Sequence, residues 1–523
     1  MTIDINIVFR VAYGEQMMLN LSLQTDDNTY KTVSLGMSTH DGNTWNYRIE
    51  DVDKRQTPHI DYYFSVNNAG LERCREWMVV CHRLDLNLMR GEHVTVNAHW
   101  HDEPSCHARL YTSAYTNCIE PRQKPALGRS VFSKTLRLIA CAPQIRSGER
   151  LAVIIRSCDA EGDIGERVYT MVEHNICEWQ VDINATTLPT SLCYRFAAID
   201  AEGTHVCEET AWRSLVPADI EASHVVAYEV ETVVFSRQEQ PLCGESIRMS
   251  TLNSPGSCGI GDFGTIGEHV STMRQRGCNM LLLPPFNDTI ATHTSADANP
   301  YSAVSVFALH PILVDLRQLP TIVDDAERTH LESLRQRLNQ TSHFDYLATL
   351  DVKQSWLRLV FQQDGDRAMH TAAFRHFFAS NEWWLVPYAQ YCYLRDAYGT
   401  ADFRIWPNHN EWTEAERGQL QNPRTKAYKK LAFFYYTQFV LHEQLCRLHD
   451  ISINNGIVLR GDLTANINPS GCDLWHSGRN VDSATWWQKI FKTVEHFYDA
   501  CHVPHALVSR PDVVQSTHLL LEE

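Results

Sequence analysis

One stretch decides how the rest of the chain is organised, namely NMLLLPPFNDTIATHTSADANPYSAVSVFALHP (Asn279–Pro311). It begins with an unbroken apolar run, Met280–Leu283, that two prolines close, and this pattern is typical of a strand covered on both faces. The preceding segment carries apolar residues at helical spacing and reaches Gly277, a residue type common just past a helix end. A helix that leads into a buried strand predicts an α/β domain.

The loop after this strand is rich in hydrogen-bonding side chains. Parallel α/β barrels place their active sites at the carboxyl ends of their strands, so we expect a polar ligand such as a sugar to bind here. Its candidate side chains are Asn287, Asp288, Thr292, His293, Thr294, Asp297, Asn299 and Tyr301. Among them, we expect His293, Asn299 and Tyr301 to contact the sugar.

Four motifs carry a family resemblance. They are GSCGIGDFG (Gly256–Gly264), LLLPPFNDT (Leu281–Thr289), THT (Thr292–Thr294) and PYSAVSVFALHPILVDLRQL (Pro300–Leu319). Together they resemble the 4-α-glucanotransferases of the amylomaltase family, glycoside hydrolase family 77, and in particular the disproportionating-enzyme branch with starch-binding modules at its N-terminus. The resemblance implies a (β/α)8 barrel that transfers α-1,4-glucosyl units between maltose, maltodextrins or glycogen and an acceptor sugar through a covalent aspartate intermediate.

Length and charge limit the remaining possibilities. The chain has 523 residues, which predicts about three domains at roughly 150 residues each. A formal charge of −17 argues against binding to nucleic acid or to an anionic membrane surface. The start of the sequence has no secretory signal pattern, and no apolar run is long enough to cross a membrane. We therefore expect a cytoplasmic protein.

The cysteines and histidines suggest no metal centre. The 16 cysteines are scattered without a CxxC pair, so we expect reduced, mostly buried thiols. His293 and His310 lack the spacing of metal ligands, and no phosphate-binding glycine loop is present. We expect neither a metal nor a cofactor.

The first 215 residues predict two β-sandwiches, at residues 1–105 and 130–215, because short apolar runs alternate with turn clusters. An internal repeat supports this division: a Gly-Glu pair precedes a tryptophan by 31 residues in each copy, from Gly14 to Trp45 and from Gly148 to Trp179. The pattern resembles family-20 carbohydrate-binding modules, which bind starch and glycogen.

Such modules stack aromatic rings on the apolar faces of glucose. Trp77 is the best stacking candidate, although a core or edge role is an open alternative. Trp45 and Trp179 lie in alternating strand patterns, which favour the core. In the second module, Cys207 occupies the position where the resemblance expects a tryptophan. This replacement argues against glucan binding by that module.

The rest of the chain fits the expected barrel. Residues 216–246 are interpreted as a connection and residues 247–523 as the N-terminal part of the barrel, with a helix-rich insertion at about 320–454. The motif GIVLRGDLTANINPSGCDLW (Gly456–Trp475) resembles the family's third barrel strand, which implies that Asp462 contacts the sugar. A carboxylate there can accept two charge-assisted hydrogen bonds from sugar hydroxyls.

The catalytic residues that the resemblance implies are missing from the sequence. A retaining transfer needs a carboxylate nucleophile and a second carboxyl group as acid/base. At the strand that should carry the family's Arg-Ile-Asp-His pattern, His502 takes the place of the arginine and Pro504 that of the aspartate. The sequence ends 16 residues after Leu507, before the expected later strands. We expect an incomplete barrel without an intact catalytic site.

Three hypotheses follow for the function. The first is a degenerate copy that retains only the binding of α-1,4-glucans such as maltose, maltodextrin, glycogen or starch. The second is one half of a split enzyme that another polypeptide completes. The third is a structural remnant without a ligand. Three outcomes are open for the exposed edges of an incomplete barrel: a second chain covers them, self-association covers them, or the incomplete barrel is only marginally stable.

Overall fold

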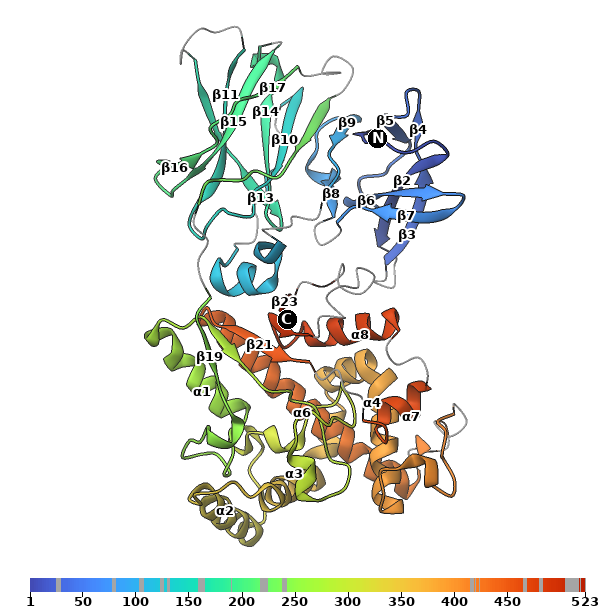
Figure 1. Cartoon of the computed structure of the whole chain (residues 1–523), viewed down its shortest axis with the longest axis vertical. Helices are drawn as coiled ribbons and strands as arrows, with labels where there is room; N and C mark the ends of the chain where they lie inside the picture. The colour runs from blue at the N-terminus through green and yellow to red at the C-terminus, as the bar shows by residue number, and fades with distance from the viewer. Residues whose placement is uncertain are drawn as a thin grey trace. The chain divides into compact units, whose positions relative to one another are not determined.

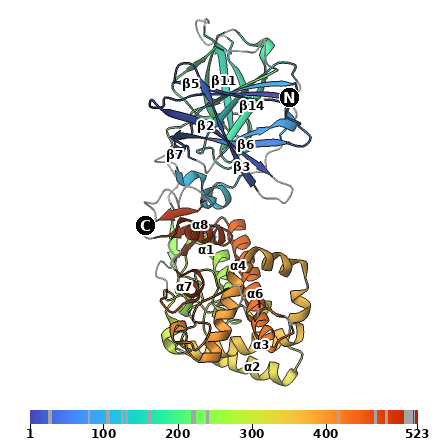
Figure 2. The same ribbon diagram turned by 90° about the vertical axis from the view of Figure 1, so that its right-hand side faces the viewer.

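A computed structural model describes the chain except for residues 25–29, 78–80, 103–107, 123–126, 129–131, 159–164, 190, 217–223, 238–241, 414–417, 419, 423, 464–467, 479–482, 504–516, 518 and 523. The chain divides into two compact units, which Figures 1 and 2 show from two sides. The first comprises Met1–Thr116 and Glu120–Gln240, and the second comprises Asn117–Ile119 and Pro241–Glu523. None of the helices described is long and apolar enough to span a membrane.

The first unit is built on one eight-stranded sheet. In spatial order its strands are β13 (Val172–Asn175), β14 (Glu178–Asn184), β10 (Thr135–Cys141), β18 (Val225–Val230), β9 (His93–Ala98), β1 (Thr2–Val8), β5 (Thr44–Ile49) and β4 (Ser38–Thr39). The central strands β10, β18, β9 and β1 run parallel, and the outer strands pair antiparallel. This sheet therefore continues from one sequence repeat into the other.

Two smaller sheets complete the unit. The first repeat contributes β3 (Tyr30–Gly36), β2 (Glu15–Gln24), β6 (His59–Asn68), β7 (Leu71–Arg75) and, on β6, β8 (His82–Asp85). The second contributes β12 (Arg167–Thr170), β11 (Arg150–Ser157), β15 (Leu192–Ile199), β16 (His205–Glu208) and, on β15, β17 (Arg213–Leu215). Each encloses its own apolar core, and Trp45 and Trp179, both 4% exposed, lie in these cores. The core role expected for both tryptophans is confirmed.

The internal repeat also holds at the level of single hydrogen bonds. In the turn before β2, Glu15 accepts a hydrogen bond on Oε2 from the Ala12 amide at 2.9 Å. In the turn before β11, Glu149 accepts one on Oε2 from the Arg146 amide at 3.0 Å. The Gly-Glu pair thus marks a turn in which the carboxylate satisfies a backbone donor three residues earlier.

The second sandwich extends beyond the boundary expected at residue 215. Strand β18 lies within the segment interpreted as a connection, 216–246, and pairs in parallel with both β10 and β9. Val233 and Phe235 also belong to the second core. The interpretation of this segment as a connection is therefore wrong as far as Phe235, because the apolar run VVAYEV supplies the strand that joins the two repeats.

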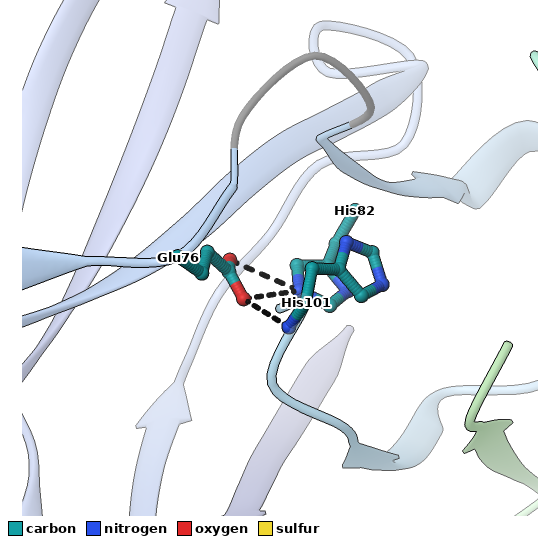
Figure 3. Close-up of side chains that lie close together, drawn as sticks. All are labelled: Glu76, His82 and His101. Carbon is teal, nitrogen blue, oxygen red and sulfur yellow. Dashed lines mark hydrogen bonds and ion pairs between the residues drawn. The ribbon is translucent and has the colours of Figure 1, made fainter. Parts of the chain in front are cut away.

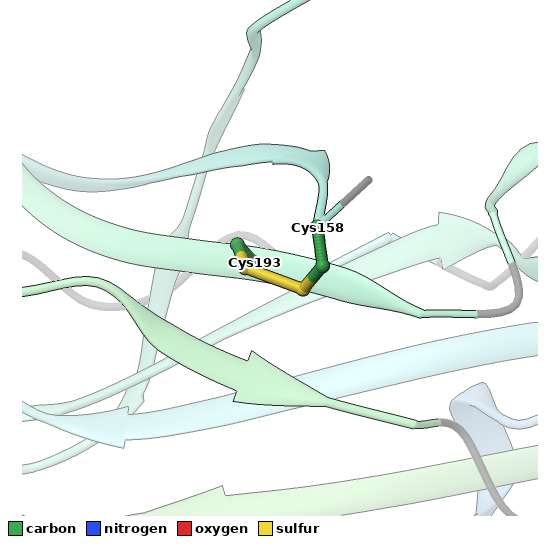
Figure 4. Close-up of a disulfide and its surroundings, with 2 residues drawn as sticks. All are labelled: Cys158 and Cys193. Atoms are coloured by element: carbon green, nitrogen blue, oxygen red, sulfur yellow. A yellow bond between two sulfur atoms is a disulfide. The ribbon is translucent and has the colours of Figure 1, made fainter. Parts of the chain in front are cut away.

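One disulfide corrects the expectation of reduced thiols throughout. Cys158, at the end of β11, is bonded to Cys193 on β15 (Figure 4). The pairing of β11 with β15 brings the two residues together, since Arg156 lies opposite Cys193. The other cysteines of the described residues are free, and several are buried.

The second unit contains a parallel sheet whose strands follow chain order: β19 (Gly244–Ser246), β20 (Met280–Leu282), β21 (Val458–Asp462), β22 (Ala500–His502) and β23 (Leu520–Glu522). The predicted helix before β20 is α1 (Phe263–Met273), and its apolar face is buried. Within the described residues the sheet is open, with β19 and β23 at its edges, and β23 is a strand that the sequence did not predict.

Long helices fill the sequence between β20 and β21. They are α2 (Asp325–Asn339), α3 (Tyr346–Met369), α4 (Ala372–Tyr398) and α6 (Lys426–Asn454), followed after β21 by the shorter α7 (Cys472–Ser477) and α8 (Ala484–Val494). Helix α6 packs against α1, α3 and α4. The helix-rich insertion is therefore present, and its aromatic side chains form the helix–helix core that their density indicates.

Candidate functional site

A cavity of about 530 Å³ lies at the carboxyl ends of the first three parallel strands. Its lining includes Ser246–Ser250 at and after the end of β19, Leu282–Pro285 at and after the end of β20, and Arg460 and Asp462 on β21. Asp297 and Tyr301 from the polar loop also line it. Successive parallel strands end at the same edge of a sheet, so their side chains gather here.

Asp462 has a side-chain partner at each of its two carboxylate oxygens. The Tyr301 hydroxyl donates a hydrogen bond to Asp462 Oδ2 at 2.8 Å. On the neighbouring strand β22, His502 lies directly opposite Asp462, and its Nδ1 lies 2.8 Å from Asp462 Oδ1. Three residues singled out in the sequence therefore meet at one point.

Two other expected contacts lie elsewhere in the loop. Asn299 accepts a hydrogen bond on Oδ1 from the Tyr301 amide at 3.2 Å, which shapes the turn before the tyrosine, but it does not line the cavity. His293 turns towards α4, with its Nε2 3.1 Å from Asp396 Oδ1. Burial would raise the pKa of Asp396, but the hydrogen bond with His293 and the charge of Arg395 hold it below the usual value.

The loop is fixed by its own buried polar groups. Asp297 accepts hydrogen bonds from the Thr292 amide, at 3.1 and 3.0 Å, and from the Thr292 hydroxyl at 2.9 Å. Asp288 accepts a hydrogen bond from the Tyr388 hydroxyl of α4 at 2.8 Å. The two aspartates that were candidate sugar contacts are therefore buried structural groups, and of the two only Asp297 also lines the cavity.

The sequence did not single out Arg460 or Tyr346 as candidates, although both line the cavity. Arg460 is two residues before Asp462 on the same strand, so strand alternation places both side chains on the same face. This spacing could have identified Arg460 as a candidate from the sequence. The hydroxyl of Tyr346, at the start of α3, lies 3.0 Å from His310 Nε2. Burial raises the pKa of this tyrosine. No local pattern indicates this contact.

The expected nucleophile position, Pro504, lies outside the described residues. His502, expected at the place of the family's arginine, is described at the end of β22 beside Asp462. Trp77 belongs to the first unit. It is half-buried, with its ring edge-on to Tyr111 at a centroid distance of 4.8 Å, and its amide donates to the His101 carbonyl at 2.8 Å.

A second cluster of ionisable groups lies in the first unit. Glu76, His82 and His101 each offer a potential metal-ligand atom within 4.8 Å of the others (Figure 3). However, His82 Nε2 lies 3.0 Å from Glu76, and its Nδ1 lies 2.8 Å from Glu229. Burial would lower the pKa of His82, but these two carboxylates raise it well above the usual value. Metals bind neutral imidazole, so the cluster fits a buried ion-paired network better than a metal site.

Residues 247–485, within the second unit, match the model of a glycoside hydrolase family. The description of that family is 4-alpha-glucanotransferase, and curated proteins with the same description resemble part of this chain.

The relatives share modest identity. The 4-alpha-glucanotransferase DPE2 of Oryza sativa subsp. japonica is 28% identical over 232 residues, which cover 44% of this chain and 24% of the relative. The 4-alpha-glucanotransferase of Chlamydia pneumoniae is 23% identical over 300 residues, which cover 51% of this chain and 55% of the relative. The chain therefore spans about a quarter and about half of these relatives.

Solved structures give weaker similarity. The amylomaltase from Corynebacterium glutamicum aligns with a TM-score of 0.42 and 15% identity, over 72% of this chain and 54% of that one. The amylomaltase from Streptococcus agalactiae in complex with acarbose aligns with a TM-score of 0.40 and 15% identity, over 50% and 59%. The family assignment therefore rests on the sequence match.

Proposed function

We propose that this chain binds α-1,4-glucans in the cavity at the ends of β19, β20 and β21. The observation that carries the proposal is the position of Asp462 at the end of a parallel strand, paired with Tyr301 on the cavity wall. The match of residues 247–485 to the 4-alpha-glucanotransferase family supports a glucan as the ligand.

The lining of the cavity suits a sugar ring. Asp462 supplies a carboxylate that can accept hydroxyl hydrogen bonds, and Arg460 supplies a charged donor. Pro284, Pro285 and the ring of Tyr301 supply apolar surface for the C–H faces of glucose. A pocket with apolar walls and a few convergent polar groups is the usual form of a small-ligand site.

We further propose that the chain binds glucan without transferring glucosyl units. The carboxylates of the described cavity lining are Asp297 and Asp462. Asp297 accepts hydrogen bonds from Thr292. Asp462 accepts one from Tyr301, and its other oxygen lies within hydrogen-bond distance of His502. A retaining transfer needs one carboxylate that attacks the sugar and a second that acts as acid/base, and Pro504 brings no ionisable group to the expected nucleophile position.

Calorimetric titration with maltoheptaose tests the binding site. The substitution Asp462→Asn keeps the side-chain shape but removes the charge, and we expect it to weaken binding by roughly tenfold or more, the usual value of a charge-assisted hydrogen bond. Asp402→Asn is the matched control, since Asp402 pairs with Arg404 and does not line the cavity. Equal affinity of the Asp462→Asn variant and the unmodified chain would overturn the proposed site.

A weaker glucan site in the first β-sandwich is part of the same proposal. Trp77 is half-buried against Tyr111, so only part of its ring is available for stacking. Trp77→Ala should lower the affinity for soluble starch but leave the maltoheptaose titration of the cavity unchanged. Unchanged starch binding in a folded Trp77→Ala variant would remove Trp77 from the site.

A completed enzyme is the second candidate function. It is favoured by the open edges of the parallel sheet in the described residues, where β19 and β23 each pair on one side. Such edges expose unpaired backbone groups that another chain can pair with. A second polypeptide that co-purifies with this chain and restores transfer from maltotriose would support this candidate. Its absence from material purified under native conditions would argue against it.

A further inference from the structure

Two cysteines face each other at the start of the parallel sheet, outside the cavity lining. Cys243 directly precedes β19, and Cys278 lies two residues before β20. Their Sγ atoms are 4.0 Å apart. A disulfide needs a sulfur–sulfur distance of about 2.05 Å. Side-chain rotations that shorten the present distance by about 2 Å would therefore allow the bond to form.

The backbone holds this pair in place. The Cys243 amide donates to Asn279 Oδ1 at 2.7 Å, and the Cys243 carbonyl accepts from the Asn279 amide at 3.0 Å. Asn279 is the immediate neighbour of Cys278. The parallel register of Gly244 opposite Met280 continues the same alignment into the strands. The two thiols are therefore held together by the fold, which favours an intramolecular reaction.

Both thiols are also accessible. Cys243 is exposed and Cys278 is partly exposed, whereas six of the described free cysteines are buried. Oxidation selects accessible thiols that have a second thiol close by. Cys74, the other exposed free cysteine of the described residues, is on β7 in the first unit and serves as a control for accessibility alone.

We propose that Cys243 and Cys278 form a reversible, redox-dependent disulfide that fixes the edge strand β19 to β20. With oxidised glutathione, the Cys243 thiolate attacks one sulfur of the glutathione disulfide and releases one reduced glutathione. The Cys278 thiolate then attacks the Cys243 sulfur of the mixed disulfide and releases a second reduced glutathione. Two protein thiols are oxidised, and one glutathione disulfide is reduced.

The bond acts on the wall of the cavity. Strand β19 has three residues and, in the described sheet, pairs with β20 on one side. Its last residue, Ser246, and the next four residues line the cavity, and so do Leu282–Pro285 at and after the end of β20. A cross-link at the start of both strands restricts their separation and stabilises this wall. The proposal does not depend on the identity of the ligand.

Peptide mapping of the full chain tests the disulfide. The protein is equilibrated with oxidised glutathione, its remaining thiols are blocked with N-ethylmaleimide, and it is digested with trypsin without reduction. We expect a linked pair of peptides, from Gln238–Arg248 and from Gly277–Arg317, that separates on treatment with dithiothreitol. The linked peptides that contain Cys158 and Cys193 serve as the internal standard for a disulfide.

Variants separate the proposal from non-specific oxidation. Cys278→Ser should leave Cys243 as a stable mixed disulfide with glutathione, and Cys74→Ser should leave the linked pair unchanged. In the unmodified chain, hydrogen exchange of residues 244–250 should slow on oxidation, and this slowing should be lost in Cys278→Ser. The proposal is overturned if oxidation of the unmodified chain gives only glutathionylated Cys243, or if Cys243 links to a different cysteine.

Discussion

Tyr301 and Asp462 are 161 residues apart in sequence, yet the Tyr301 hydroxyl donates a hydrogen bond to Asp462 Oδ2 at 2.8 Å. This bond raises the pKa of Tyr301. It joins the polar loop after β20 to the end of β21 and so fixes the position of the carboxylate that we propose as the sugar contact. His502 holds the other oxygen of the same carboxylate.

We predict that Tyr301→Phe weakens maltoheptaose binding by roughly five- to tenfold. The phenylalanine keeps the ring but loses the hydroxyl, and a hydrogen bond of this kind contributes about 1 kcal/mol. Calorimetric titration measures the change. Tyr13→Phe, at a fully exposed position of the first unit, is the control that should bind as the unmodified chain does. An unchanged affinity in Tyr301→Phe would show that the Asp462 carboxylate needs no support from the loop.

A second prediction concerns β18, the strand through which the two sandwiches share one sheet. A fragment of residues 1–237 should unfold cooperatively on heating, whereas a fragment of residues 1–215 should be markedly less stable or aggregate. The reason is that the shorter fragment lacks β18, the strand that pairs with both β9 and β10 and closes their shared sheet. Circular dichroism during heating compares the two. Equal melting temperatures would contradict the structural role of β18.

The sequence predicted the elements whose signals are local. The strand Met280–Leu282 and the helix before it were found from apolar spacing, and the core positions of Trp45 and Trp179 from strand alternation. The sequence also singled out Tyr301, from the polar loop after this strand, and Asp462, from the family resemblance, and both line the cavity.

Loop side chains were harder to predict because distant partners set their direction. His293 was expected to contact sugar but turns to Asp396 on α4, a residue 103 positions later. Strand β18 was interpreted as a connection because its partners are distant in sequence: Val225 pairs with Thr135 of β10, 90 residues earlier, and with Val94 of β9, 131 residues earlier. Nothing in the sequence between them indicates that the two repeats share one sheet.

A third prediction follows from the buried carboxyl of Glu178 in β14. Burial, and then the charge of Glu229, raise its pKa to about 8, while His82 and Arg83 oppose the shift. The folded state therefore holds a proton that the unfolded chain has released by about pH 4.5, so stability falls as the pH rises towards 8. The raised pKa of His82 acts in the same direction, since its ion pairs are lost once it is deprotonated.

Glu178→Gln should remove part of this pH dependence. We expect the melting temperature of the variant to match that of the unmodified chain near pH 4, where Glu178 is protonated in both the folded and the unfolded state. The variant should exceed the unmodified chain increasingly as the pH rises to 9, where Glu178 is a buried charge. Glu202→Gln, in an exposed turn of the same sandwich, is the control and should show no such difference. Parallel melting curves for Glu178→Gln and the unmodified chain across this range would refute the prediction.

The last prediction is that this chain alone does not transfer glucosyl units from maltotriose. Proline has no side-chain nucleophile, so Pro504 cannot form the glycosyl ester that a retaining mechanism requires. Asp462 is a poor substitute, because Tyr301 and His502 already hold both of its oxygens and attack needs reacting atoms aligned at roughly 3–3.5 Å.

Restoring the aspartate with Pro504→Asp should also leave the chain inactive, because a second carboxyl group must act as acid/base and the described cavity lining offers none that is unengaged. Chromatography of maltotriose incubated with purified protein tests both statements, since transfer yields glucose together with longer maltodextrins. Asp462→Asn is the informative control. Products that form in proportion to the unmodified protein, and that disappear in Asp462→Asn, would show that Asp462 has taken over the chemistry that we assign to no residue of this chain.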